Sequence, residues 1–451
     1  MSDAIALVAL TTADLDAYLA TAAERTRRWV AAQQFRAQPL TSCVIPDADG
    51  GVAEVLVGIA SASELNTLAH LPATLPAGDY SLCSRGVQLD HARVALGFAL
   101  ASYQFKRYKA ARREPARLLA PLGTYLDEVA ALVAATTRTR DLVNTPTEDM
   151  GPAELGTAAR EIAERFGAQY REWIGNELLE ANFPAIHAVG RASHRAPRLI
   201  EVRAGDPALP EVAIIGKGVC FDTGGLDIKA ADGMRNMKKD MGGAAHAIAL
   251  AELVLERRLP IRLRLLVPAV ENAIGANAYR PGEVIRTRAG LSVEIDNTDA
   301  EGRVVLCDAL AYAAESKPKL IVDFATLTGA ARIALGPDLP ALFGNNEPLR
   351  DRLVELGREV QDPLWPMPLW QPYLAMLESG IADLANSGPS RHAGAITAAL
   401  YLQRFVPPNI PWLHLDTYAW NDNERPGRPR GGEAMGLRAV YELLKRDYGA
   451  S

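Results

Sequence analysis

"LSVEIDNTDAEGRVVLCDALAYAAESKPKLIVDFA", from Leu291 to Ala325, alternates between two kinds of hydrophobic pattern. LSVEI (Leu291–Ile295) and KLIVDFA (Lys319–Ala325) have the short, apolar, β-branched composition of buried strands. VVLCDALAYAAE (Val304–Glu315) lies between them and has the length and pattern of a helix. A strand, a helix and a second strand in succession are typical of a sheet whose faces are covered by helices. This stretch therefore predicts an α/β fold.

The same alternation continues on both sides of this stretch. Further apolar strand candidates lie at Arg198–Val202, Glu211–Gly216, Arg262–Val270 and Trp412–Asp416, and Ala244–Glu256 is a further helix candidate. Runs that are apolar throughout indicate strands buried on both faces. We predict a C-terminal domain with a doubly wound, mostly parallel central sheet flanked by helices.

The first hundred residues have a smaller α/β pattern of their own. Ala4–Leu10 and Gly51–Ile59 are strand-like, and His91–Phe105 is an apolar helix candidate. The basic run Lys106–Arg113 and the break at Pro115 then mark a change in composition. We predict an N-terminal α/β domain over residues 1–115, a connecting helix over 116–143 and a C-terminal domain over 144–451.

The composition is that of an ordinary globular protein. The chain has 451 residues, of which 49% are hydrophobic and 23% charged, and its formal net charge is −6. A negative charge gives no general attraction for nucleic acid, and no apolar run is long enough to cross a bilayer. The N-terminus lacks the basic start of a signal peptide, and the four cysteines form no CxxC pair. We expect a cytoplasmic protein that uses neither a membrane nor a nucleic acid as partner.

The segment NTDAEGR places acids and a base at alternate positions, Asp299, Glu301 and Arg303. If the segment were extended, these three side chains would point to one side and converge. A surface loop with a local salt bridge is one interpretation of this pattern. A metal site is the other.

A second polar segment, GKGVCFDTGGLDIK, directly follows the strand candidate EVAIIG and supplies Lys217, Asp222 and Lys229. Asp240 lies shortly after it in MKKDM. Ligands of doubly wound sheets bind at the carboxyl ends of the strands, so these side chains could meet those of NTDAEGR. Four carboxylates in one place would repel, and two divalent metal ions would relieve that repulsion. A loop of surface ion pairs stays open for each segment taken alone.

No other catalytic centre is indicated by the sequence. The seven histidines are scattered and none lies in an HExxH motif. His246 and His414 lie in apolar segments, which favours packing in the core. Cys220 has no histidine near it in sequence, so we interpret it as a small packing residue and not as a nucleophile.

These polar segments resemble the leucyl aminopeptidase (cytosol aminopeptidase) family. NTDAEGR is similar to the family signature, and GKGVCFDTGGLDIK followed by MKKDMGGAA is similar to its other metal-binding segment. RDLVNTPTEDMGP, DFATLTGA and AGAITAALYLQRFV also resemble family segments, in the same order. The resemblance implies a small N-terminal α/β domain joined by a helix to a catalytic domain. It also implies a homohexamer that removes N-terminal residues from peptides with two divalent ions, zinc or manganese, per subunit.

The resemblance assigns a role to each polar residue. Lys217, Asp222, Asp240 and Glu301 resemble the ligands of one metal ion, and Asp222, Asp299 and Glu301 resemble those of the other. Asp222 and Glu301 would then bridge both ions. The backbone carbonyl of Asp299 would add a further ligand.

The resemblance also implies how the reaction proceeds. Lys229 resembles the catalytic lysine, and Arg303 resembles the arginine that holds a bicarbonate ion. A water activated by the two metals would attack the scissile carbonyl, with bicarbonate as proton shuttle, in a peptide whose free N-terminus binds a metal. The first side chain of the substrate, which we expect to be apolar and leucine-like, would enter a pocket formed by Met237, Thr326, Gly329 and Ala434.

Two features depart from the family pattern. Asp227 stands where relatives carry a neutral residue, so it either pairs with Lys229 or faces solvent, and we favour solvent. The segment Asp416–Gly432 is unusually polar and could alter the rim of the pocket.

Two other functions stay open at this point. The basic run Lys106–Arg113 would suit a DNA-binding or scaffolding hexamer, although the net charge of −6 opposes that function. A carboxylate-rich site for two metals would also suit a phosphoesterase, although the histidine ligands usual in such sites are missing.

Overall fold

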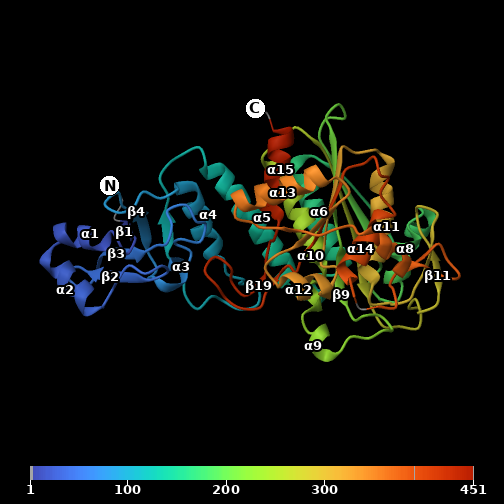
Figure 1. Cartoon of the computed structure of the whole chain (residues 1–451), viewed down its shortest axis with the longest axis horizontal. Helices are drawn as coiled ribbons and strands as arrows, with labels where there is room; N and C mark the ends of the chain where they lie inside the picture. Colours follow the sequence, from blue (N-terminus) through green and yellow to red (C-terminus); the bar gives the residue numbers. More distant parts are fainter. Residues whose placement is uncertain (1–3, 391, 450–451) are drawn as a thin grey trace. The chain divides into compact units, whose positions relative to one another are not determined.

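The computed structural model describes residues 4–390 and 392–449, which pack as two compact units (Figure 1). The first unit comprises the chain up to Thr137 together with Asp422–Arg430. The second comprises Arg138–Asn421 and the chain from Gly431. The division between them falls inside helix α5 (Leu126–Asn144).

The first unit is a small sheet with helices on both faces. Its sheet is five-stranded among the described residues, in the order β2-β3-β1-β4-β5. Along β1, Leu7 packs on the face covered by α4, whereas Val8 packs on the face covered by α1 and α2, as the alternation of a strand requires. The elements are β1 (Ile5–Leu10), α1 (Leu15–Thr21), α2 (Glu24–Ala32), β2 (Ser42–Pro46), β3 (Val52–Gly58), α3 (Leu71–Thr74), β4 (Asp79–Leu82), α4 (His91–Ala101) and β5 (Arg117–Leu119).

The connecting helix begins later than the sequence predicts. Residues 117–119 form strand β5, which pairs in parallel with β4, and α5 starts only at Leu126. Pro121 and Gly123 lie between them, and both residue types disfavour a helix interior. The prediction of helix over 116–125 was therefore wrong. The domain bounds at residues 115 and 143 stay a prediction.

The second unit is built on a large central sheet. This sheet is nine-stranded among the described residues, in the order β15-β14-β17-β13-β8-β10-β7-β6, with β9 paired to β10. Its elements are η1 (Thr147–Asp149), α6 (Pro152–Phe166), β6 (Gln169–Ile174), α7 (Glu177–Glu180), α8 (Pro184–Gly190), β7 (Arg198–Ala204), β8 (Glu211–Gly216), β9 (Gly218–Asp222), α9 (Ala231–Met234), η2 (Met237–Met241), α10 (Gly242–Glu256), β10 (Arg262–Asn272), β11 (Val284–Arg286), β12 (Ser292–Glu294), α11 (Glu301–Glu315), β13 (Leu320–Ala325), α12 (Gly329–Leu335), β14 (Ala341–Gly344), α13 (Glu347–Glu359), β15 (Trp365–Pro366), η3 (Gln371–Leu377), β16 (Leu384–Ala385), α14 (Gly394–Gln403), β17 (Trp412–Asp416), β18 (Trp420–Asn421), β19 (Gly431–Gly432) and α15 (Leu437–Tyr448).

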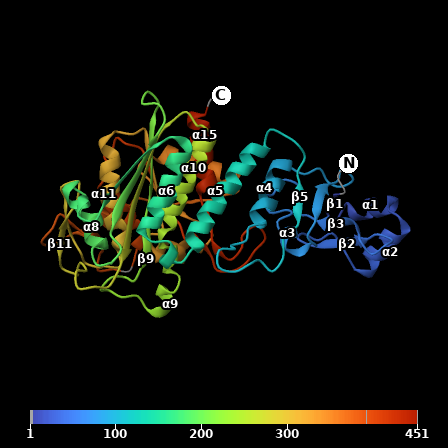
Figure 2. The same ribbon diagram turned by 180° about the vertical axis from the view of Figure 1, so that it is seen from behind.

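The centre of this sheet is parallel and its flanks are antiparallel. Strands β17, β13, β8 and β10 run in parallel, whereas β14 pairs antiparallel with β17 and β7 antiparallel with β10. Figures 1 and 2 show α6 and α10 on one face of the sheet and α8, α11 and α14 on the other. This is the mostly parallel α/β sheet with helices on both faces that the sequence predicts, so the fold class is confirmed.

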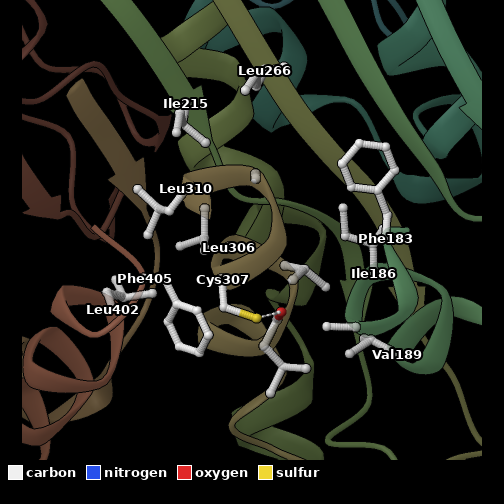
Figure 3. Close-up of a cluster of buried hydrophobic side chains, with 14 of the residues drawn as sticks. Phe183, Ile186, Val189, Ile215, Leu266, Leu306, Cys307, Leu310, Leu402 and Phe405 are labelled. Atoms are coloured by element: carbon white, nitrogen blue, oxygen red, sulfur yellow. Dashed lines mark hydrogen bonds between the residues drawn. The ribbon is translucent and has the colours of Figure 1, made fainter. Parts of the chain in front are cut away.

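A continuous apolar core lies between the central sheet and α8, α11 and α14. Ile215 of β8 and Leu266 of β10 point into it from the sheet, and Leu306 and Leu310 reach it from α11 (Figure 3). Cys307 is fully buried in the same cluster. Burial on this scale fixes the register of the strands and the position of α11, whose first residue is Glu301. No helix in the described parts of the chain is long and apolar enough to span a membrane.

The strand in front of NTDAEGR does not belong to the central sheet. Strand β12 (Ser292–Glu294) pairs with β11 and β16 in a separate small sheet. In β12 only Val293 is fully buried, and one buried side chain is too little for a central strand. The segment that follows is not extended, because Asp299 lies in a turn and Glu301 begins α11. The placement of Leu291–Ile295 in the central sheet was therefore wrong, and the condition of an extended NTDAEGR segment is not met.

Candidate metal centre

A cavity of about 400 Å³ opens where the parallel strands β8, β13 and β17 end. The predicted residues that line it are Lys217, Asp222, Lys229, Met237, Asp240, Asp299, Glu301, Thr326 and Gly329. Lys217 directly follows β8, and Thr326 directly follows β13. The carboxyl ends of parallel strands meet at one edge of a sheet, which is why residues from distant segments share this cavity.

Three carboxylates converge in this cavity. Asp222, Asp299 and Glu301 each offer an oxygen atom, and these atoms all lie within 4.8 Å of one another. Asp222 and Glu301 are each only 2% exposed. Glu301 occupies the first position of α11, where the helix dipole stabilises a negative charge. The fold thus concentrates negative charge in a buried place.

Two lysines occupy the space between the carboxylates. Lys217 Nζ lies 2.7 Å from Asp240 Oδ2 and 2.8 Å from Glu301 Oε1. Lys229 Nζ lies 2.8 Å from Asp222 Oδ2 and also contacts Asp299 Oδ1. Asp240 Oδ2, Asp299 Oδ1 and Glu301 Oε1 are buried, and among the described residues these lysine ammonium groups are their partners. Buried oxygens with this need for positive charge fit divalent cations.

The protonation of these groups follows from burial and from their neighbours. Burial, together with the charge of Asp222, raises the pKa of Glu301 to about 8. Burial and Asp222 likewise raise the pKa of Asp299 to about 6. Burial opposes the charge of Lys217, but Asp240 and Glu301 outweigh it and hold the lysine pKa above its ordinary value. Without a metal ion, the centre therefore holds protons that a cation would displace.

The backbone around the lysines leaves no room for larger residues. Gly224 has a φ angle of +86°, and a Cβ atom there would lie 2.5 Å from the carbonyl oxygen of Asp227. A Cβ atom at Gly302 would lie 2.7 Å from Lys217 Cε. Both glycines allow the close approach of backbone and side chains that brings the charged groups together.

Neutral residues hold the two acidic segments to each other. Asn272 Nδ2 donates to Asp222 Oδ1 over 2.8 Å and to the carbonyl oxygen of Thr298 over 3.0 Å. The hydroxyl group of Tyr279 donates to the same carbonyl oxygen over 2.7 Å. Asn272 therefore fixes Asp222 relative to the turn that carries Asp299.

Asp227 is exposed to solvent, the alternative that the sequence favours, and it also belongs to this framework. Its Oδ2 accepts hydrogen bonds from the backbone N–H of Thr298 at 2.7 Å and from the hydroxyl of Thr298 at 3.0 Å. Its own N–H donates to Thr298 Oγ1 over 2.9 Å. No ion pair joins it to Lys229 in the described part of the chain. The structure therefore agrees with the solvent alternative and not with pairing to Lys229, and it adds that the carboxylate braces the turn before Asp299.

We expect Asp227→Ala to weaken metal binding by about 10- to 100-fold, the usual cost of losing a residue that orients a ligand. Asp227→Asn keeps an acceptor for the Thr298 N–H and should lose less. Chelator competition measures the affinity. Asp206→Ala removes a similar turn-forming aspartate from a distant loop and serves as the control. Equal metal affinity in the wild type and in all three variants would contradict the bracing role.

Arg303 and Ala434 are not among the residues that line the cavity. Arg303 is 8% exposed, its Nη1 donates to the carbonyl oxygen of Asn386 over 2.9 Å, and its Nε has no partner. The side chain of Asn386 in turn accepts from the N–H groups of Asp296 and Asn297. Arg303 thus lies outside the lining of the cavity, and its buried Nε has no hydrogen-bond partner among the described residues.

The polar segment Asp416–Gly432 contributes only its first residues to the cavity. Asp416, Thr417 and Tyr418 line it, whereas Asp422–Arg430 packs as part of the first unit. Asp416 Oδ1 accepts from the N–H of Leu327, and Asp416 Oδ2 accepts from the hydroxyl of Thr328. Most of the polar residues in that segment therefore do not form the rim of this cavity.

The sequence of this chain matches a known family over both units. The family model described as "Cytosol aminopeptidase family, catalytic domain" matches residues 137–441, and "M17 aminopeptidase, N-terminal domain" matches residues 5–121. The chain belongs to the cytosol aminopeptidase family. The resemblance inferred from the two metal-binding segments is confirmed.

Curated relatives and solved structures agree with this assignment. A probable cytosol aminopeptidase of Syntrophotalea carbinolica is 41% identical over 372 residues, which cover 78% of this chain and 74% of that relative. One of Nocardia farcinica is 38% identical over 433 residues, covering 91% and 86%. The crystal structure of the cytosol aminopeptidase from Coxiella burnetii is 48% identical, with a TM-score of 0.96 and coverage of 99% and 98%. The bottromycin maturation enzyme BotP, solved in complex with Mn, is 32% identical, with a TM-score of 0.88 and coverage of 99% of each chain.

As a member of the cytosol aminopeptidase family, this chain is a metal-dependent aminopeptidase, a hydrolase that acts on peptide bonds. Asp222, Asp299 and Glu301 in its cavity are the acidic residues that could hold the metal. Sequence reasoning did not find Asn272, Asn386 or Lys239, which also hold or line the centre. Lys239 stood in the quoted MKKDM segment, next to Asp240. Nothing near Asn272 or Asn386 in sequence indicated a role.

Proposed function

We propose that this aminopeptidase uses two divalent ions held by the cavity residues. Lys217, Asp222, Asp240 and Glu301 would hold one ion, and Asp222, Asp299 and Glu301 the other, with Asp222 and Glu301 shared. The observation that supports this most directly is the convergence of the carboxylates of Asp222, Asp299 and Glu301, whose oxygen atoms all lie within 4.8 Å of one another. Two bound ions would supply an activated water and polarise the scissile carbonyl. The manganese bound in the BotP structure favours manganese as the metal of this enzyme, and zinc is the alternative.

The residues of this chain would then change partners. Lys217 would lose its proton before its nitrogen could act as a ligand. Lys229 would leave Asp222 and Asp299, and its ammonium group could donate to the carbonyl oxygen of the substrate, where negative charge develops. The unpaired Nε of Arg303 would hold a bicarbonate ion, which supplies a base for proton transfer.

The substrate would be a peptide with a free N-terminus and an apolar, leucine-like first residue. Met237, Thr326 and Gly329 line the cavity beside Asp240, and Met237 lies three residues before Asp240 in the helical turn η2. Ala434, 6% exposed, stays a proposed pocket residue outside the lining. We also propose a cytoplasmic homohexamer, which size-exclusion chromatography with light scattering would test.

Hydrolysis rates test the proposal as a whole. Leucine p-nitroanilide, its N-acetylated form and an aryl phosphate are compared after removal of bound metal and addition of zinc or manganese. We expect hydrolysis of the free-amine substrate only, restored by one of the two metals. Hydrolysis of the aryl phosphate in preference to the anilide would favour the phosphoesterase function instead. Equal hydrolysis of the acetylated substrate would contradict recognition of the free amine.

Metal affinity should rise with pH. Glu301, with its pKa raised to about 8, and Lys217, with its pKa also raised, both hold protons in the metal-free centre at neutral pH. Because a ligand must be deprotonated, each binding event releases protons, so binding tightens as pH increases through the range of about 6 to 8. Chelator competition at several pH values measures this slope. A pH-independent affinity over that range would show that neither group loses a proton on binding.

A further inference from the structure

One wall of the cavity carries two cations that the proposed metal centre does not use. Lys239 comes from η2, Arg332 from α12 and Tyr418 from the turn after β17, and all three line the cavity. Lys239 Nζ lies 4.9 Å from the centroid of the Tyr418 ring, and Arg332 Cζ lies 4.7 Å from it. Three elements that are remote in sequence thus bring two positive charges to one aromatic ring.

Lys239 is a buried lysine that forms no ion pair in the described part of the chain, although the charges of Asp240 and Asp416 act on it. The residue is only 6% exposed, yet no carboxylate of the described residues forms an ion pair with it and no acceptor forms a hydrogen bond with its side chain. Lys217, which is 2% exposed, contacts two carboxylates in the same cavity. Buried charges are normally paired, so Lys239 has an unmet need for an anion.

The acid on this wall does not meet that need. The carboxylate of Asp416 accepts from the N–H groups of Leu327 and Thr328 and from the hydroxyl of Thr328. Arg332 is exposed and contacts the same ring as Lys239. The wall around Tyr418 therefore keeps an excess of positive charge and faces the space where a substrate would lie.

We propose that Lys239 and Arg332, which both contact the Tyr418 ring, form a subsite for a carboxylate group of the peptide substrate. An ammonium and a guanidinium group are the donors that bind carboxylates in charge-assisted hydrogen bonds. Attraction to the ring limits the positions that the two cations can take before the substrate arrives. The inference deepens the proposed function and rests on it, because it assumes that the scissile bond lies at the metal centre of the same cavity.

A peptide can supply this carboxylate from two places. One is the C-terminus of a very short peptide, and the other is the side chain of an acidic residue. Matched pairs of substrates separate the two sources. Leu-Gly and Leu-Gly-amide differ only in the terminal carboxylate, and Glu-Gly-amide and Gln-Gly-amide differ only in the side-chain carboxylate.

The experiment measures kcat/KM for both pairs with the metal-loaded enzyme. We expect the wild type to prefer the carboxylate member of at least one pair, and we expect Arg332→Gln to reduce that preference by about fivefold, the upper range for a partly exposed ion pair. Lys239→Met should reduce it at least as much, because Lys239 is buried. Arg235→Gln removes an exposed arginine that does not line the cavity, and it should leave the preference as in the wild type.

The outcomes separate the subsite from the function on which it rests. A preference within the Leu-Gly pair assigns the subsite to the C-terminus, and one within the Glu and Gln pair assigns it to the side chain. Hydrolysis of all four peptides without any preference overturns the subsite alone, as does a preference that both Arg332→Gln and Lys239→Met retain. Failure to hydrolyse any of them with added metal overturns the proposed function as well. Arg332→Gln changes an exposed residue, so the test stands even if Lys239→Met does not fold.

Discussion

Replacement of Asp222 by alanine is expected to abolish stoichiometric metal binding and peptide hydrolysis together. Its Oδ2 faces the space now held by Lys229, and its Oδ1 is fixed by Asn272 and by the N–H of Gly224, each at 2.8 Å. If both ions share Asp222 as a ligand, as we propose, its replacement removes a ligand from both sites at once. Loss of a residue that merely supports a ligand costs about 10- to 100-fold, so loss of this carboxylate should cost more than about 100-fold. Elemental analysis of the purified variant gives the metal content.

Two further variants separate the charge of Asp222 from its part in the fold. Asp222→Asn keeps an oxygen that can accept from Gly224 and Asn272, so it should fold like the wild type and still lose metal. Asp232→Ala removes an exposed aspartate of α9 from the same segment and should keep full metal. A wild-type metal content in Asp222→Ala would exclude the bridging role.

The strands of the central sheet could be predicted because their burial is visible in local sequence. EVAIIG and WLHLD coincide with β8 and β17, and every residue of both strands is buried. LSVEI looked similar but forms a strand of three residues in the middle of a separate small sheet, and its Ser292 and Glu294 are only partly buried. A single sequence shows that a segment is apolar, but it does not show which sheet the segment joins. That depends on pairing with β16, which lies far along the chain.

The acids and lysines of the centre could be predicted because each lies in a dense polar motif next to a strand or helix. The residues that orient them could not. Asn386 accepts from the N–H groups of Asp296 and Asn297 and binds Arg303 through its carbonyl oxygen, but it is an ordinary asparagine in its own segment. Asp227 could be recognised as unusual, yet its partner Thr298 lies in another motif. Such roles arise only when the fold brings the two segments into contact.

Lys229→Ala is expected to lower kcat by about 100- to 1000-fold, the usual effect of removing one donor to a developing oxyanion. Among the described residues, the Lys229 side chain is held by ion pairs with Asp222 and Asp299, and 17% of that side chain is exposed. If cations replaced it between those carboxylates, its ammonium group would be free to reach the substrate. KM should change much less than kcat, because the interaction strengthens only in the transition state. Steady-state kinetics on leucine p-nitroanilide, normalised to metal content, measure both constants.

A purely electrostatic role for Lys229 predicts a different result. If the lysine only balanced the charges of Asp222 and Asp299 before metal binding, its removal would tighten metal binding and leave kcat per bound metal unchanged. Lys319→Ala, an exposed lysine before β13, controls for a general change of charge. Lys229→Arg keeps the positive charge but replaces the compact ammonium with a planar group, so a donor role predicts that it restores little of kcat. Full activity in Lys229→Arg would instead favour charge balance, since that role depends on the sign of the charge and not on the position of one donor.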